Sequence, residues 1–212
     1  MPVEAEDESR ASVEEDTVRA RSYEEQARSH TANGDYAAAA AALTEAIALA
    51  PSVGYYYYLR ANARGHEGTR DEALDDYARA IALGFDSYGV FHDRALFFKC
   101  LGEIEEALAD YHRAIERNPR SPESRNNRAM IYLQRGQLDE ALEDLRVAVE
   151  HSAEAVTPND GTYECSMAEV LCALERWDEA ERAMRDAIEV DGKWLEYARS
   201  ADELRGIRSR FA

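Results

Sequence analysis

The fold is decided by a string that recurs along the chain: RDEALDDYARAIALG at residues 70–84, IEEALADYHRAIERN at 104–118 and LDEALEDLRVAVEHS at 138–152. Each copy has a Glu-Ala pair near its start, a large apolar residue four positions after that alanine, and a second alanine seven positions after it. Successive copies begin 34 residues apart. A fixed period of this kind indicates a repeat protein, in which each unit covers the apolar face of its neighbour.

Two further copies complete a set of five. The anchor alanines follow one another at spacings of 34, 34, 34 and 39 residues, which indicates one insertion before the last copy. Alanine also stands twelve positions before and seven positions after every anchor. The fifteen positions are Ala27, Ala39, Ala46, Ala61, Ala73, Ala80, Ala95, Ala107, Ala114, Ala129, Ala141, Ala148, Ala168, Ala180 and Ala187.

These columns predict two helices in each unit. Alanine at fixed positions allows helix backbones to approach closely, and the apolar residues follow the 3.6-residue period of a helix. Glycine stands five positions before four of the anchors, where a turn that needs positive φ would join the two helices. These glycines are Gly34, Gly68, Gly102 and Gly136, and Glu175 replaces glycine in the fifth copy.

The pattern resembles the tetratricopeptide repeat family. The period, the Gly34-Asp35-Tyr36 turn and the Glu-Ala second helix all match that family, as do Pro51 and Pro119 at the ends of two units. The early aromatic residue of the repeat appears as Tyr23, Tyr57 and Phe91, whereas Arg125 and Glu164 replace it in the last two units. The resemblance covers about residues 20–194. It implies binding of peptides or proteins, but it does not identify the partner.

The expected fold is therefore all-α: a right-handed α-solenoid of five helix-turn-helix, tetratricopeptide-like repeats with a C-terminal capping helix. The predicted segments are an acidic, disordered tail (1–19), repeats at 20–53, 54–87, 88–121, 122–155 and 161–194, a loop insertion (156–160) and the capping helix (195–212). Two alternatives remain open for the tail, which are a docking arm for a basic partner and an acidic extension of the first helix.

Composition excludes several classes of function. The 212 residues contain 25 Lys and Arg against 43 Asp and Glu, which gives a net charge of −18. Nucleic-acid binding is not expected, because neutralising phosphates needs a cationic surface. No apolar run is long enough to cross a membrane, and the acidic N-terminus does not have the pattern of a signal peptide. Three cysteines without such a signal predict reduced thiols and a cytoplasmic protein.

Arginine and aspartate occur together at two further columns. Arg60, Arg94 and Arg128 stand thirteen positions before their anchors, and Asp76, Asp110 and Asp144 stand three positions after the same anchors. Repeats one and five lack both residues. We therefore predict ion pairs that bridge the two helices of a repeat, rather than an arginine ladder that faces a ligand.

In this family the first helices of the repeats line a concave groove. The matching positions in the middle of this surface hold residues that can bind a peptide, because amides bond its backbone and aromatic or Met side chains offer apolar area. The groove candidates are Tyr55, Tyr58, Asn62, His66, His92, Leu96, Lys99, Asn126, Met130 and Gln134. The same offsets also select Leu133 in repeat four and Thr162, Cys165, Glu169, Cys172 and Ala173 in repeat five.

Several more specific functions are not expected. Chaperone-binding members of the family use Lys and Asn as a carboxylate clamp, whereas the matching positions here hold Glu24, Arg28, Leu59, Gly89 and Asp93. No metal site, cofactor motif or catalytic constellation is visible in the sequence, and Cys165 and Cys172 have no histidine at ligand spacing. We therefore expect neither an enzyme nor a bound cofactor or metal.

The leading hypothesis is a non-catalytic scaffold or adaptor that holds a peptide or a partner helix in its groove. The acidic field would favour a basic partner and would be screened by salt. The main alternative is a self-associating structural solenoid whose role is oligomer assembly. RNA recognition by paired helices is a third hypothesis, which the net charge opposes. We also expect that replacing Tyr58, Asn62 and Asn126 by alanine would remove binding without affecting the fold.

Overall fold

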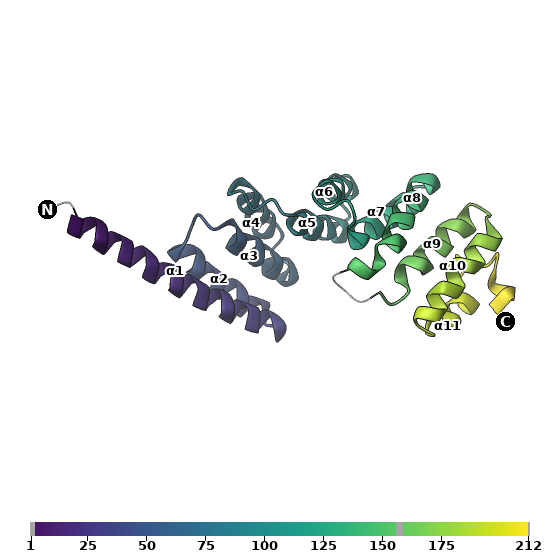
Figure 1. The fold of residues 1–212 in the computed structure, drawn as a ribbon, viewed down its shortest axis with the longest axis horizontal. Coiled ribbons are helices and arrows are strands. Elements are labelled where there is room, and N and C mark those ends of the chain that lie inside the picture. Colours follow the sequence, from purple (N-terminus) through teal and green to yellow (C-terminus); the bar gives the residue numbers. More distant parts are fainter. Residues whose placement is uncertain (1–2, 156–158, 212) are drawn as a thin grey trace. The chain divides into compact units, whose positions relative to one another are not determined.

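The computed structural model describes residues 3–155 and 159–211, and for residues 3–13 and 153 it describes the backbone alone. Within these ranges the chain forms eleven α-helices, two short 3₁₀-helices and no β-strand (Figure 1). The α-helices are α1 (Val3–Ala32), α2 (Tyr36–Leu49), α3 (Gly54–Glu67), α4 (Arg70–Ala82), α5 (Tyr88–Leu101), α6 (Ile104–Arg117), α7 (Pro122–Gln134), α8 (Leu138–Glu150), α9 (Thr162–Ala173), α10 (Trp177–Val190) and α11 (Trp194–Ser200). The 3₁₀-helices are η1 (Ser152–Glu154) and η2 (Arg208–Phe211).

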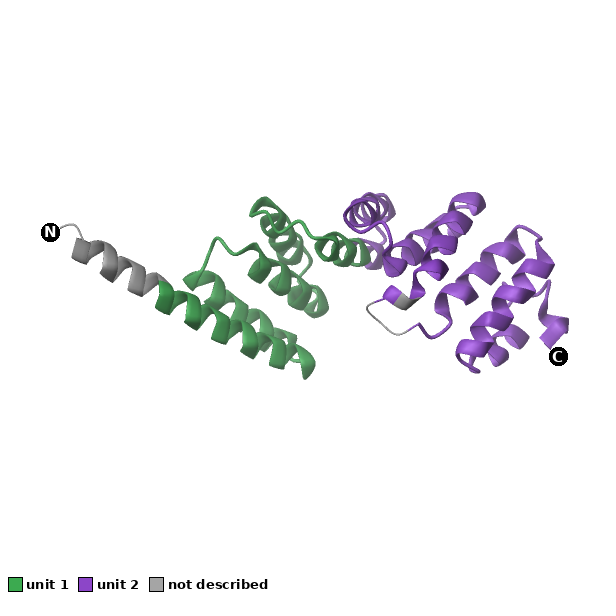
Figure 2. Ribbon diagram, in the orientation of Figure 1, with its two compact units in different colours: residues 1–97 green, residues 98–212 purple. Residues whose placement is uncertain are grey.

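The chain divides into two compact units, Met1–Phe97 and Phe98–Ala212 (Figure 2). In the first unit α1 packs on α2, α2 on α3, and α3 on α4. In the second unit α7 packs on α8, α8 on α9, and α9 on α10, while α11 contacts both α10 and η2. Each unit is thus a run of helix pairs stacked on their neighbours, and the fold is an all-α helical repeat solenoid.

The fifteen equivalent alanines explain this packing. Every one of them is buried, with at most 2% of its surface exposed. The apolar residues four positions after the anchors are buried to the same degree, namely Leu43, Tyr77, Tyr111, Leu145 and Met184. The alanines allow close approach of the backbones, and the larger side chains fill the space between neighbouring helices.

The turn between the two helices of a repeat has the left-handed backbone that the glycine column predicts. Gly34, Gly68, Gly102 and Gly136 have φ between 72° and 81°. Glu175, at the same position in repeat five, has φ 58° and is the one non-glycine residue with positive φ in the described part of the chain. The repeat geometry therefore imposes a strained conformation on Glu175, because its Cβ crowds the backbone there.

The N-terminal segment corrects one expectation. Helix α1 extends back to Val3, so the described part of segment 1–19 is helical rather than disordered. Residues 1–2 lie outside the described part. Glutamate is the most frequent residue of the segment, and its Glu, Ala and Arg residues favour helix. The structure thus has the alternative arrangement, in which the acidic segment extends the first helix.

The C-terminal segment corrects a second expectation, since a single capping helix over 195–212 does not form. Helix α11 ends at Ser200, because Ala201 adopts an extended backbone, and the chain then turns before η2. The turn places Gly206 against the ring of Trp177, where a Cβ would lie 2.0 Å from a ring carbon. Leu204, Ile207 and Phe211 become buried. Burial of these three side chains outweighs continuation of the helix.

The loop insertion predicted at 156–160 is described only in part. Residues 156–158 lie outside the described residues. Asn159 donates a hydrogen bond from its side-chain amide to Glu164, at 3.1 Å. Tyr57 in repeat two and Arg125 in repeat four stand at the position of Glu164. Each donates a hydrogen bond to the carbonyl oxygen of a proline six residues earlier, which is Pro51 for Tyr57 and Pro119 for Arg125. Glutamate cannot donate when ionised, and the asparagine of the insertion supplies the donor.

Candidate binding site

The paired arginine and aspartate columns form forks that join the two helices of a repeat. In repeat two, Nε and Nη2 of Arg60 donate to the two carboxylate oxygens of Asp76, both at 2.8 Å. Arg64 adds a third bond to the same carboxylate at 2.6 Å. The side chain of Arg60 is 12% exposed and that of Asp76 is 6% exposed. Such a bidentate and mostly buried pair is stronger than an exposed one.

Repeat four contains an equivalent fork. Arg128 donates to both oxygens of Asp144, at 2.7 and 2.9 Å, and Arg125 donates to one of them at 2.8 Å. These guanidinium groups are therefore engaged within the repeat and are not available to a ligand. In repeat three, Arg94 belongs to the first compact unit and the buried Asp110 to the second, and their pairing remains a prediction.

In the first unit, two groove candidates belong to a hydrogen-bonded cluster. The Tyr58 hydroxyl donates to Oδ2 of Asp93 at 2.6 Å, and the Asn62 amide donates to the same oxygen at 3.0 Å. Asn62 in turn accepts a hydrogen bond from the buried Tyr77 hydroxyl. Burial and the neighbouring Asp93 carboxylate raise the pKa of Tyr58, so its hydroxyl stays protonated and able to donate.

This cluster changes the expectation for mutations. Tyr58 and Asn62 connect α3 with α4 and α5, so their loss would leave polar partners unsatisfied. Replacing them is therefore expected to lower stability, and a triple alanine variant that includes Asn126 cannot separate binding from folding.

Other groove candidates of the first unit lie beside this cluster or apart from it. The rings of Tyr55 and Tyr58 both lie against Phe85, with centroids 5.3 and 5.2 Å away, and Arg28 donates to the Tyr55 hydroxyl. His66 is exposed and stacks on Tyr36 at 4.2 Å. The remaining two candidates, both half-buried, are His92 and Leu96.

The groove candidates of the second unit are less closely connected. Lys99 donates to Asn127 at 3.2 Å, which joins α5 to α7. Asn126 and Met130 are half-buried and Gln134 is exposed. The side-chain oxygen of Asn126 is buried and accepts no hydrogen bond from the described residues. These contacts do not bring the four candidates into one cluster.

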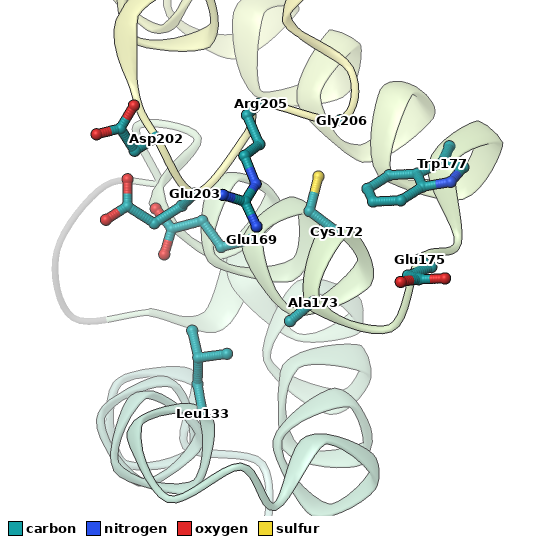
Figure 3. Close-up of a pocket in the computed structure, with 10 residues that line it drawn as sticks. All are labelled: Leu133, Glu169, Cys172, Ala173, Glu175, Trp177, Asp202, Glu203, Arg205 and Gly206. Carbon is teal, nitrogen blue, oxygen red and sulfur yellow. The ribbon is translucent and has the colours of Figure 1, made fainter.

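A pocket of about 320 Å³ lies in the second unit, between repeats four and five and the C-terminal segment (Figure 3). Helix α7 contributes one lining residue and α9 contributes three. The turn after α9 and the start of α10 contribute one residue each, and the chain between α11 and η2 contributes the other four. The lining residues are Leu133, Glu169, Cys172, Ala173, Glu175, Trp177, Asp202, Glu203, Arg205 and Gly206.

Glu169 and Glu203 are two of the carboxylates that line this pocket. The Tyr197 hydroxyl donates to Oε1 of Glu169 at 2.5 Å. Burial raises the pKa of Glu169, the hydrogen bond from Tyr197 opposes this increase, and the charge of Glu203 adds to it. Glu169 is therefore a half-buried carboxylate that lies near a second negative charge.

Four residues of this pocket, Leu133, Glu169, Cys172 and Ala173, stand at groove offsets in the sequence. None of them is among the groove candidates, which come from the middle of that surface. Two signals in the sequence mark the fifth repeat: Glu175 at a glycine position and Trp177 two residues after it. The contribution of residues 202–206 could not be found from the sequence, because it depends on where α11 ends.

The all-α array of helix pairs defines the chain as a helical repeat protein. The family model for the tetratricopeptide repeat matches residues 24–88 and 101–156, and the chain belongs to that family. Members of this family are generally non-catalytic scaffolds that bind protein or peptide partners. No curated protein sequence matches the chain significantly.

Solved structures share the fold at low sequence identity. PilF of Pseudomonas aeruginosa is 16% identical with a TM-score of 0.75, and the match covers 92% of this chain and 90% of PilF. The MamA protein is 16% identical with a TM-score of 0.67, covering 84% and 95% respectively. YrrB, described as a TPR protein with an unusual peptide-binding site, is 20% identical with a TM-score of 0.63, covering 90% and 91%. In the described part of this chain, no helix has the length and apolar character of a membrane span.

Proposed function

We propose that the chain is a non-catalytic adaptor that binds a peptide or helix of a partner protein on the face formed by the first helices of its repeats. The observation that carries this proposal is the pocket of the second unit, since α7 and α9 line it with residues at groove offsets. YrrB, which has the same fold, is described as having a peptide-binding site, and this supports the same kind of ligand here.

The chemistry of the pocket supports binding rather than catalysis. Its one potential nucleophile is Cys172, and burial raises the pKa of this thiol to about 11. The thiol therefore stays protonated at neutral pH, whereas catalytic cysteines have lowered pKa values. The neighbouring Cys165 is also buried, and its pKa is raised for the same reason.

The net charge of −18 supports a basic partner, because a field of one sign attracts and orients ligands of the other. The proposal does not include a chaperone C-terminus as the ligand. Two residues at the clamp positions are engaged elsewhere, since Arg28 bonds Tyr55 and Asp93 accepts from Tyr58. The three free thiols are consistent with a reducing compartment, and the proposal places the protein in the cytoplasm.

The alternative, a solenoid that assembles end to end, has less support. Assembly through the C-terminal end would need an open apolar face on the last repeat. In the described residues this face is covered by the chain itself, since Leu204, Ile207 and Phe211 are buried and Arg210 pairs with Asp178 and Glu181. Assembly by this route would first require the C-terminal segment to undock.

Site-specific photo-crosslinking in cells tests the proposal. A photoreactive phenylalanine analogue at Gln134, which is exposed on α7, probes the first-helix face, and the same analogue at the exposed Asp139 on α8 is the matched control. We expect one crosslinked partner from position 134 and none from position 139. Equal crosslinking at both positions, or a crosslink from position 134 only to another copy of the chain, would contradict the proposal.

A further inference from the structure

The pocket of the second unit carries more negative than positive charge. Four carboxylates line it, from Glu169, Glu175, Asp202 and Glu203, against the single guanidinium of Arg205. Asp202 is paired with Arg208, which does not line the pocket. In the described residues, no ion pair links Glu169, Glu175 or Glu203 to a cation.

Three of the four carboxylates are gathered on one side. Figure 3 shows Glu169, Asp202 and Glu203 close together, with Trp177 and Glu175 on the other side of the pocket. Glu169 and Glu203 are near enough for the charge of Glu203 to raise the pKa of Glu169. Two carboxylates that repel one another, with no protein cation paired to either, would be stabilised by a positive group between them.

Part of the lining is apolar. Leu133 of α7, Cys172 of α9 and the ring of Trp177 line the pocket beside the carboxylates. A long side chain with an aliphatic stem and a charged end matches this division, because its stem can lie on the apolar wall while its end reaches the carboxylates. A metal ion fits less well, since no group of three His, Cys, Asp or Glu side chains in the described residues is arranged to hold one.

We infer that this pocket binds a basic side chain of the partner, with arginine preferred, through Glu169 and Glu203. The inference rests on the proposed adaptor function and adds the ligand chemistry of its pocket. Arginine is preferred over lysine because its guanidinium is planar, more weakly hydrated, and able to bond two carboxylate oxygens at once. The overall negative charge assists capture of the same ligand.

Nuclear magnetic resonance can test this directly, because the chain has two tryptophans and only one lines the pocket. The probe is a short acetylated and amidated glycine–serine peptide with one central arginine. Matched peptides contain lysine, or citrulline, which has nearly the shape of arginine without its charge. We expect the arginine peptide to shift the Trp177 indole N–H resonance and to leave Trp194 unchanged. The citrulline peptide should bind at least about tenfold more weakly.

Two double variants complete the experiment. Glu169→Gln with Glu203→Gln removes the pocket charges, while the glutamine oxygen at 169 can still accept from Tyr197. Glu189→Gln with Glu196→Gln removes two exposed charges away from the pocket. The pocket variant should lose the discrimination between arginine and citrulline, and the control should keep it. Glu203→Gln alone serves as a second test, because Glu203 is exposed and its replacement does not threaten the fold.

Equal binding of arginine and citrulline peptides to the wild type, or unchanged discrimination in the pocket variant, would overturn the inference. Tighter binding of lysine than of arginine would overturn the stated preference. These failures are distinct from failure of the adaptor function, which the crosslinks from positions 134 and 139 report. A further outcome is a partner that crosslinks at position 134 and yet binds the pocket variant as tightly as the wild type. That result would support the adaptor function and contradict the role of the pocket.

Discussion

Repeat four and repeat five lie side by side in the second unit and differ at the turn between their helices and at the two fork columns. Repeat four has glycine at its turn and an arginine fork on Asp144. Repeat five has Glu175 at the turn, and Met167 and Ala183 in place of the fork. The pocket lies at repeat five. The columns shared by repeats hold each helix pair together, whereas the lining of the pocket includes a residue that departs from them, Glu175.

The largest effect is expected from breaking the fork of repeat four. Asp144→Ala would leave Arg125 and Arg128 mostly buried without their counter-charge, and should lower the free energy of unfolding by about 3 kcal/mol. Urea denaturation followed by circular dichroism measures the loss. Glu143→Ala, at an exposed neighbouring position, is the control and should change little. A similar loss in both variants would mean that the fork contributes nothing specific.

The polar cluster of the first unit should show the next largest effect. Asn62→Ala removes the acceptor of the Tyr77 hydroxyl and a donor to Asp93, and should cost about 2 kcal/mol. Asn126→Ala is the comparison, because the buried side-chain oxygen of Asn126 accepts no hydrogen bond from the part of the chain that the structure describes. We expect the midpoint of thermal unfolding to fall clearly in the first variant and little in the second. The opposite order would contradict the assignment of Asn62 to the framework.

Exchanging turn residues between repeats sharpens the comparison further. Glu175→Gly should raise the free energy of unfolding by about 1 kcal/mol, because glycine adopts positive φ without strain. Gly136→Glu should lower it by a similar amount. The cause at Gly136 would be φ alone, since no atom of a neighbouring side chain lies within 4 Å of a Cβ there. Guanidinium denaturation measures the free energy of unfolding of both variants. A change of the same sign in both would contradict the role of φ at this turn.

The smallest effect concerns pH. Because the folded state raises the pKa of Glu169, it binds this proton more tightly than the unfolded chain does. The contribution of Glu169 is therefore most favourable at low pH and is lost as the pH rises above 4.5, its ordinary pKa, through the raised value. The stability of Glu169→Gln relative to the wild type should increase over this window. A flat difference between the two stability–pH curves would show that burial does not affect this carboxylate.

The sequence was sufficient for the helical framework, because each framework position repeats. Alanine in fifteen equivalent positions leaves one consistent arrangement of helix pairs, and glycine at the turns marks where each helix reverses direction. In each repeat the arginine and the aspartate columns are either both present or both absent, and this indicates the pairs of Arg60 with Asp76 and of Arg128 with Asp144. Repetition thus converts a weak signal at one residue into a strong one across the chain.

The site was harder to predict, because it depends on residues that occur once. Nothing in the string around Ala201 shows that the chain leaves the helix there, since burial of Leu204, Ile207 and Phe211 decides it. In the sequence, Asp93 is noted only because it does not match the residue types of the carboxylate clamp. Its hydrogen bonds to Tyr58 and Asn62 depend on how α3 and α5 come together in the fold. Helix in the acidic segment before Ala20 was one of three alternatives that composition could not separate.

The most direct test measures stability and partner binding in the same two variants. We expect Asp144→Ala to lose stability but, while folded, to keep its affinity for the crosslinked partner. The pocket variant, with Glu169→Gln and Glu203→Gln, should keep its stability at neutral pH and lose at least about tenfold in affinity. If the pocket variant binds the partner as tightly as the wild type, or if Asp144→Ala loses affinity without losing stability, then the division between shared framework and divergent site is wrong.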